Sequence, residues 1–183
     1  ELGDPNDPTT DIGPIINESS LNKLNNHISK LKADKEFIEC DKDCLKNGFF
    51  VKPIAFKIDN IKEIDGEKFG PILHFISYKS EEIDKVLEEV NSTGFGLTMG
   101  VHSRITEKAN KIFEKAKVGN FYLNRDIVGA VVGVQPFGGQ GLSGTGPKAG
   151  GPNYLKSFTT EKTFTDNVMA TGGNIDLLNK NNQ

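Results

Sequence analysis

Residues 129–152, GAVVGVQPFGGQGLSGTGPKAGGP, hold nine of the twenty glycines of this 183-residue chain. Glycine loses more conformational entropy on folding than any other residue, so this density indicates backbone that turns with positive φ or approaches another group closely. A flexible linker is the alternative, but flexible linkers consist of Gly and Ser. This stretch instead contains an apolar, strand-like run at 130–134 and a fixed turn signal, PFGG, at 136–139. The sequence therefore predicts an ordered loop.

Two phosphate-binding patterns lie inside the stretch, and their context argues against both. Residues 139–144, GQGLSG, fit the dinucleotide pattern G-x-G-x-x-G, but that fingerprint opens a helix, and the next residues, TGPKAGGP, cannot be helical. Residues 141–146 have P-loop spacing, but Pro147 intervenes before Lys148, and Ala149 replaces the magnesium-binding Ser or Thr. Two interpretations of the loop stay open. Its backbone amides form a nest for an anion such as a carboxylate, or they satisfy one another.

The N-terminal third contains one clear helical pattern. Apolar residues recur at every third or fourth position from 21 to 31, and Asn17 or Ser19 can cap the start of the helix. His27 falls within this helix and is interpreted as a surface residue.

Strand and helix patterns alternate along the rest of the chain. Strands are predicted at 49–56 with an interruption at Pro53, at 71–78, at 97–101 and at 121–123. Helices are predicted after Ser80 and after Thr106, each residue serving as a cap, and Gly119 can end the second helix in a left-handed turn. This order predicts an α/β fold, a mostly parallel sheet flanked by helices.

Composition excludes several classes of protein. A net charge of −3 with interleaved Lys and Glu gives no electrostatic footprint for nucleic acid, and no apolar run is long enough to span a membrane. Cys40 and Cys44 fit neither a disulfide framework nor a zinc site, so we expect free thiols in a reducing cytoplasm. Neither is expected to be a nucleophile, because a reactive thiolate needs positive surroundings and Cys40 lies between two acidic residues.

The glycine-rich stretch and the segments before it resemble the aldehyde dehydrogenase superfamily. Residues 136–144, PFGGQGLSG, are similar to the family motif P-F-G-G-x-x-x-S-G, and residues 67–71, EKFGP, are similar to E-x-F-G-P. Three further segments match in the expected order: DIGP at 11–14, GFFVKP at 48–53 and GNFYLN at 119–124. The resemblance covers nearly the whole chain.

The flanks of the main motif resemble one branch of this family. GAVVG at 129–133 and TGPKAGGP at 145–152 look like the Δ1-pyrroline-5-carboxylate dehydrogenases, which oxidise glutamate γ-semialdehyde to glutamate with NAD in proline catabolism. The tail, TEKT at 160–163 through GGN at 172–174, is similar to that of the bacterial bifunctional proline utilisation proteins, PutA. In those proteins a flavin-dependent proline dehydrogenase precedes this module, so FAD is expected only where such a domain is fused upstream.

The resemblance implies that the chain is the C-terminal part of the catalytic domain. The family's nucleophilic cysteine, its oxyanion-stabilising Asn, its general-base Glu and its NAD-binding fold all precede the position of Glu1. We therefore expect no catalytic residue and no metal ligand in this chain, and no activity from it alone.

The resemblance does transfer two groups of binding residues. Glu67 matches the carboxylate that accepts hydrogen bonds from the nicotinamide ribose, and Phe69 matches the aromatic ring beside the nicotinamide. Gly150 and Gly151 match the loop whose N–H groups hold the α-carboxylate of the substrate, and Phe158 matches the aromatic wall around its methylenes.

The same resemblance divides the chain in two. Residues 1–157 are expected to form part of the catalytic domain, and residues 158–183 a β-rich segment through which family members form homo-oligomers. Two alternatives stay open from sequence: a non-catalytic module that captures carboxylates or amino acids, and a module for assembly.

Overall fold

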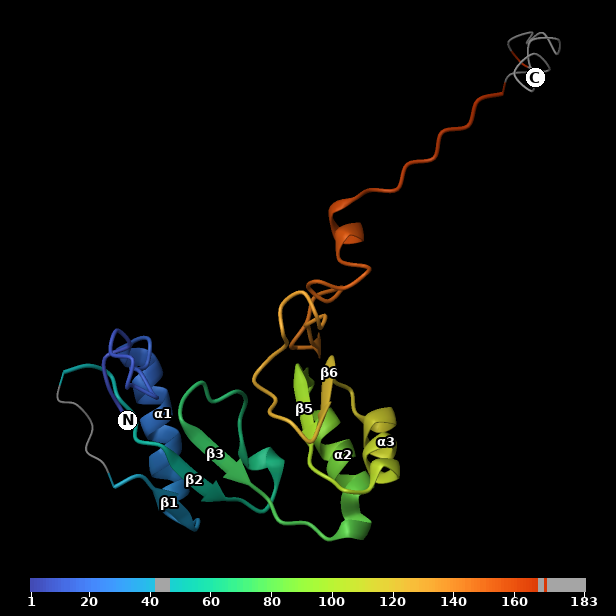
Figure 1. Ribbon diagram of the computed structural model, residues 1–183. Helices are drawn as coiled ribbons and strands as arrows, with labels where there is room; N and C mark the ends of the chain where they lie inside the picture. Colours follow the sequence, from blue (N-terminus) through green and yellow to red (C-terminus); the bar gives the residue numbers. More distant parts are fainter. Residues whose placement is uncertain (42–46, 168–169, 171–183) are drawn as a thin grey trace.

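A computed structural model describes residues 1–41, 47–167 and 170 of the chain (Figure 1). The first lobe contains helix α1 and strands β1 to β3, and the second contains α2, α3, β5 and β6. The glycine-rich stretch follows β6 and leads into an extended C-terminal segment that points away from both lobes.

Helix α1, Glu18–Lys32, begins where the sequence predicts. The Asn17 side chain accepts a hydrogen bond from the Ser20 N–H at 2.8 Å, which satisfies one of the free donors of the first turn. The helix buries Leu24, His27 and Leu31. The prediction of His27 as a surface residue is therefore wrong, because its side chain shares the inward face of the helix with two leucines.

The first lobe is built on a three-stranded sheet in the order β1, β2, β3. Strand β1, Phe37–Glu39, is antiparallel to β2, Ile54–Lys57, and β2 is parallel to β3, Ile72–Phe75. The core of this lobe lies between β2 and α1, with Phe56 fully buried among Leu31, Ile54 and Ile58. Only the second half of the strand predicted at 49–56 forms, because Pro53 has no N–H to pair.

The second lobe contains a β-α-β unit. The 3-10 turn η2, Ser80–Glu82, leads into α2, Ile83–Ser92, and strand β5, Thr98–Val101, is followed by α3, Thr106–Lys115, and by β6, Asn120–Leu123. Strands β5 and β6 are parallel, as the alternating pattern predicts. Leu87, Ala109 and Tyr122 are buried here.

Three predicted helix boundaries in this lobe are wrong. Ser80 is not the cap of a helix, because it is already the first residue of η2, and Glu82 is at the N-cap of α2. The residue at the N-cap of α3 is Ile105, and Thr106 is already helical. The helix ends at Lys115, where Ala116 turns the chain into an extended conformation, and Gly119 does not have positive φ.

The prediction of one mostly parallel sheet is confirmed only in part. The α/β class holds and two strand pairs are parallel, but the described residues form separate small sheets. A third sheet pairs β4, Phe95–Gly96, with β7, Gln140–Gly141, and joins the glycine-rich stretch to the second lobe. Residues 130–134 form a turn and not the expected strand, since the N–H groups of Val134 and Gln135 both donate to the Val131 carbonyl.

The C-terminal region is extended after the 3-10 turn η3, Leu155–Phe158. Residues 159–167 contain no strand, so the β-rich segment expected at 158–183 is not confirmed, and residues 168–169 and 171–183 lie outside the described part.

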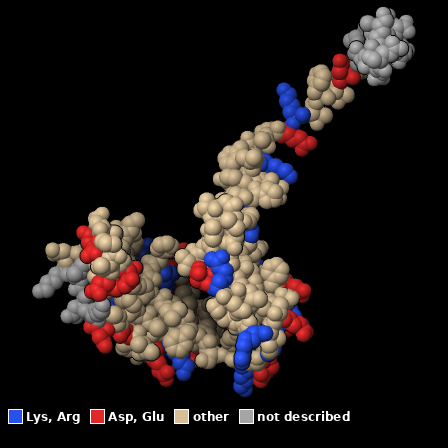
Figure 2. Space-filling model, in the orientation of Figure 1, with Lys and Arg blue, Asp and Glu red and all other residues tan. Residues whose placement is uncertain are grey.

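None of the helices in the described part of the chain has both the length and the apolar character that a membrane span requires. Acidic and basic side chains are interspersed over both lobes (Figure 2).

Candidate functional site

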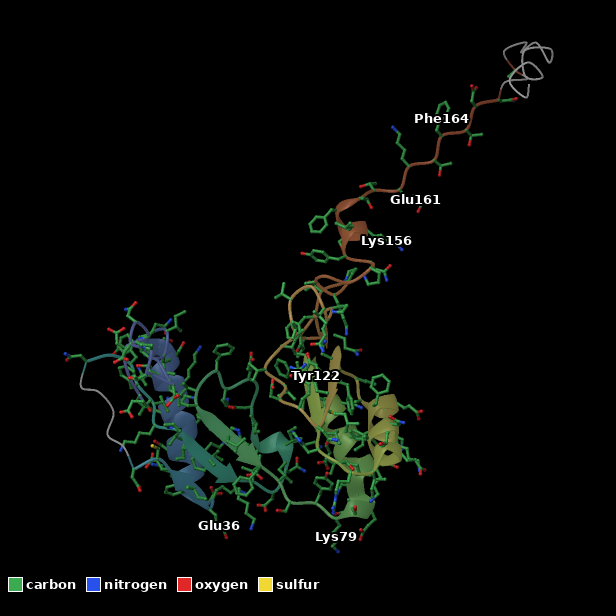
Figure 3. The ribbon with its side chains drawn as sticks, viewed as in Figure 1. Glu36, Lys79, Tyr122, Lys156, Glu161 and Phe164 are labelled. Atoms are coloured by element: carbon green, nitrogen blue, oxygen red, sulfur yellow. The ribbon has the colours of Figure 1, made fainter. Side chains whose placement is uncertain are left out.

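Strand β6 holds the glycine-rich stretch through two buried polar side chains. Asn120 is 8% exposed, and its side-chain amide donates to the Pro136 carbonyl at 2.9 Å and accepts from the Gly138 N–H at 3.1 Å. The Tyr122 hydroxyl donates to the Gly129 carbonyl at 2.7 Å. Figure 3 shows Tyr122 where β6 meets this stretch. The stretch is therefore an ordered loop, as predicted.

The glycines of the PFGG and SG motifs allow backbone segments to touch. A Cβ on Gly119 would overlap the Gly138 carbonyl, and a Cβ on Gly144 would overlap the Gly139 carbonyl. An antiparallel bridge between Phe137 and Ala149 then closes the loop. Residues 145–151 form bends and turns without a helix, in agreement with the exclusion of both phosphate-binding patterns.

Gly150 and Gly151 lie at the far end of this loop. Gly150 is exposed and has φ +71°, a conformation that a residue with a Cβ rarely adopts. Gly151 lines a cavity of about 850 Å³ together with Asn120, Pro136 and Lys148. The Gly151 N–H donates to the Lys148 carbonyl at 3.0 Å, so one of the two amides is already partnered inside the loop. A carboxylate would share that donor with Lys148.

Phe158 lies beyond this cavity at the end of η3. Its ring is 72% exposed and meets Tyr154 edge to face, with centroids 5.3 Å apart. Tyr154 and Phe158 form an aromatic pair next in sequence to the glycine-rich loop, and neither belongs to the described residues that line the cavity with Gly151.

Glu67 and Phe69 lie on the loop between the 3-10 turn η1, Ile61–Glu63, and β3. Both side chains are exposed, Phe69 by 85%. They line a cavity of about 580 Å³ whose other wall is α1. The backbone lies close to that helix at Gly70, where a Cβ would be 2.6 Å from Leu24 Cδ1. An ion pair between Lys68 and Asp65 closes the loop on itself.

Glu67 also borders the space between the two lobes. It lines a second cavity of about 530 Å³ with Thr98 and Met99 of β5 and with Ser143 of the glycine-rich stretch. The structure therefore brings the candidate cofactor contact close to the SG motif. Gly151 opens into a different cavity, so the two groups of predicted binding residues lie apart among the described residues.

A pair of histidines beneath the Glu67 loop was not predicted from sequence. His27 of α1 and His74 of β3 have their Nε2 atoms 2.8 Å apart. Burial lowers the pKa of both rings, and the nearby Lys68 lowers it further. The signal for His27 was its position on the apolar face of α1, three residues after Leu24 and four before Leu31.

The described residues contain neither a disulfide nor a metal cluster. Cys40 is a half-buried free thiol, and Cys44 lies outside the described part of the chain. No group of three or more His, Cys, Asp or Glu side chains gathers there in a way that could hold a metal ion.

Residues 1–164 match the aldehyde dehydrogenase family, so the chain belongs to that family. The resemblance stated from the motifs is thereby confirmed. The α/β lobes agree with membership of that family.

The chain is similar to two kinds of characterised family member. It is 47% identical over 161 residues to the bifunctional protein PutA of Klebsiella aerogenes, and 39% identical over 168 residues to the 1-pyrroline-5-carboxylate dehydrogenase of a Geobacillus species, strain WCH70. These matches cover 84% and 91% of the chain. They cover 12% and 32% of the relatives, so the chain spans less than a third of either protein.

Solved structures give the same result. A Bradyrhizobium japonicum PutA variant, D779Y, matches with a TM-score of 0.84 and 45% identity over 94% of this chain and 18% of that protein. The 1-pyrroline-5-carboxylate dehydrogenase from Thermus with bound NAD matches with a TM-score of 0.74 and 36% identity, over 86% of this chain and 30% of that protein.

Proposed function

We propose that this chain contributes the C-terminal part of an NAD-dependent L-glutamate γ-semialdehyde dehydrogenase, which oxidises the semialdehyde to glutamate in proline catabolism. The observation that carries the proposal is the similarity of most of the chain to the 1-pyrroline-5-carboxylate dehydrogenase and PutA proteins. The activity belongs to the complete enzyme, and residues 1–157 supply part of its catalytic domain.

The surroundings of Glu67 and Phe69 fit a nicotinamide cofactor. An exposed carboxylate can accept hydrogen bonds from two ribose hydroxyls at once, and the exposed Phe69 ring offers an apolar face for the nicotinamide. Lys23 and Lys30 line the same cavity and supply positive charge for a diphosphate, whereas Lys68 is paired there with Asp65. When bound, NAD accepts the hydride that leaves the aldehyde carbon. Glu67 and Phe69 would hold and orient it.

The loop at Gly150 and Gly151 is proposed to hold the α-carboxylate of the substrate. Gly150 is exposed with positive φ, and Gly151 borders a cavity wide enough for an amino-acid semialdehyde. Phe158 is proposed to cover the methylenes of the substrate, with Tyr154 supporting its ring. Because Gly151 already donates to Lys148, the carboxylate takes a shared hydrogen bond there and a free one at Gly150.

The nucleophile is proposed to come from outside these residues. Cys40 follows strand β1 in the first lobe and lines none of the cavities that hold Glu67 or Gly151 among the described residues. Its half-buried thiol remains consistent with the free thiol expected in the cytoplasm, which we propose as the compartment. FAD enters the proposal only for a parent enzyme that also carries a proline dehydrogenase domain.

The test is a comparison of two variants of the complete enzyme, Glu67→Gln and Gly151→Val. With glutamate γ-semialdehyde and NAD as substrates, Glu67→Gln is expected to raise the KM for NAD about tenfold and to leave the KM for the semialdehyde nearly unchanged. Gly151→Val is expected to do the reverse. No oxidation of the semialdehyde by the unmodified enzyme would overturn the proposed function, and equal changes in both constants would overturn the assignment of the two sites.

Assembly is a second proposed role, and it rests on the C-terminal segment. Residues 159–167 are extended and exposed, and the Phe164 side chain, labelled on this segment in Figure 3, is 87% exposed. We propose that residues 158–183 pair with another copy in a homo-oligomer, since the extended backbone at 159–167 is suited to strand addition. A complete enzyme that stays monomeric by light scattering would contradict this role.

A further inference from the structure

We propose that Asn120 and Lys148 are positioning residues that clamp the carboxylate loop, residues 148–151, in its binding conformation. This inference rests on the proposed function, in which Gly150 and Gly151 bind the α-carboxylate of the substrate.

Asn120 fixes the PFGG turn of the glycine-rich stretch. Its side chain donates to the Pro136 carbonyl and accepts from the Gly138 N–H, at 2.9 and 3.1 Å, so one buried amide bridges both sides of Phe137. Phe137 in turn exchanges two backbone hydrogen bonds with Ala149, at 3.1 and 2.9 Å. Asn120 therefore fixes the position of Phe137, and the bridge from Phe137 fixes Ala149, the residue before Gly150.

Lys148 holds the first residue of the carboxylate loop. Its ammonium group donates to the Gly119 carbonyl at the start of β6, and its own carbonyl accepts the Gly151 N–H at 3.0 Å. Lys148 thus connects the strand to the candidate binding residue. The carboxylate loop is thus held by Gly119 through Lys148, and by Asn120 through the bridge between Phe137 and Ala149.

The clamp matters because this loop would bind through backbone. Gly150 and Gly151 carry no side chain that can adjust to the substrate, and glycine is the residue with the most freedom to lose. A loop that is ordered before binding avoids this loss during binding. The effect should fall on a substrate that uses the loop and not on the cofactor, whose candidate contacts lie in other cavities.

The experiment measures the complete enzyme with two aldehydes, glutamate γ-semialdehyde and butanal, which lacks the α-carboxylate. Asn120→Ser and Lys148→Met are expected to raise the KM for the semialdehyde about tenfold, as for loss of one buried hydrogen-bonding group. The KM for NAD and the kcat/KM for butanal should change less than about twofold. Lys148→Arg keeps a donor and should restore most of the loss.

Asn91→Ser is the matched control. The Asn91 side chain also bridges two backbone groups, donating to the Lys115 carbonyl and accepting from the Lys117 N–H, each at 2.9 Å, but it does not contact the glycine-rich loop. It should leave the KM for the semialdehyde unchanged. If Asn120→Ser fails to fold, as judged by circular dichroism, Lys148→Met decides.

The outcomes separate the clamp from the proposed function. If Gly151→Val raises the KM for the semialdehyde and Asn120→Ser and Lys148→Met do not, the clamp alone is overturned. If both aldehydes lose efficiency equally, the two residues only support the fold and the clamp is overturned. If Gly151→Val also leaves the KM for the semialdehyde unchanged, both the proposed carboxylate contact and the clamp are overturned.

Discussion

The imidazole rings of His27 and His74 meet edge to face, and their Nε2 atoms are 2.8 Å apart. One nitrogen must donate and the other accept, so the contact is lost when both rings are protonated. The pair joins α1 to β3 at the base of the Glu67 loop. Lys68 and Lys30 face it with positive charge, and Asp65 opposes them at His27.

This pair predicts a loss of stability in mild acid. Both pKa values are lowered in the folded state, chiefly by burial, so the unfolded chain binds more protons as the pH falls. The contribution is fully present above the unfolded pKa of about 6.5 and is lost progressively below it. The free energy of unfolding in urea should therefore be lower at pH 5.5 than at pH 7.5.

A variant isolates the contribution of the pair. His74→Gln removes one titrating ring and should flatten the pH dependence, whereas His102→Gln, at an exposed position, should leave the difference between the two pH values unchanged. An unchanged pH dependence in His74→Gln would show that other groups cause the acid sensitivity.

The start of α1 gives a prediction for stability at neutral pH. Asn17→Ala removes the acceptor of the Ser20 N–H and should lower the free energy of unfolding by about 1 kcal/mol. Asn25→Ala, at an exposed position inside the same helix, should change it by less than about 0.5 kcal/mol. Equal effects of the two substitutions would argue against a capping role.

Substitution of Gly119 is expected to lower the free energy of unfolding more than loss of the Asn17 cap does. In Gly119→Ala the new methyl group meets the Gly138 carbonyl, and neither backbone segment has a flexible side chain that can move aside. We expect a loss of about 3 kcal/mol, measured by thermal or urea unfolding. Gly146→Ala is the control, because no atom beyond its two chain neighbours lies within 4 Å of its new methyl group and its φ is not positive. A mild effect at Gly119 would mean that the loop can shift away from β6.

The sequence predicted the features that depend on local patterns. The spacing of apolar residues along a short segment predicts the apolar face of α1, and a polar residue before it predicts the cap. The alternation of such segments predicts the β-α-β order from β5 to β6. The apolar run at 130–134 predicts a strand but forms a turn, because a short apolar run does not by itself distinguish a strand from other structure. Val132 is 96% exposed, so the described chain does not bury it.

The sequence predicts which residues belong to the candidate site, but not how they are arranged in space. Glu67 and Gly151 were identified through family resemblance, and their separation into different cavities depends on how two lobes pack, which spacing does not encode. Partners that are distant in sequence were not predicted. The His27 contact with His74 crosses 47 positions, and the Asn120 contacts with the loop cross 16 and 18.

The isolated 183-residue chain provides the last prediction. It should form no NADH from glutamate γ-semialdehyde and NAD, since its described thiol, Cys40, lies away from the Glu67 and Gly151 cavities. Calorimetric titration with glutamate should detect no binding tighter than about 1 mM, because backbone donors at Gly150 and Gly151 supply only part of a site. Turnover by the purified chain would contradict the assignment of the nucleophile to other residues. Micromolar binding of glutamate without turnover would favour the carboxylate-binding module over the enzyme fragment.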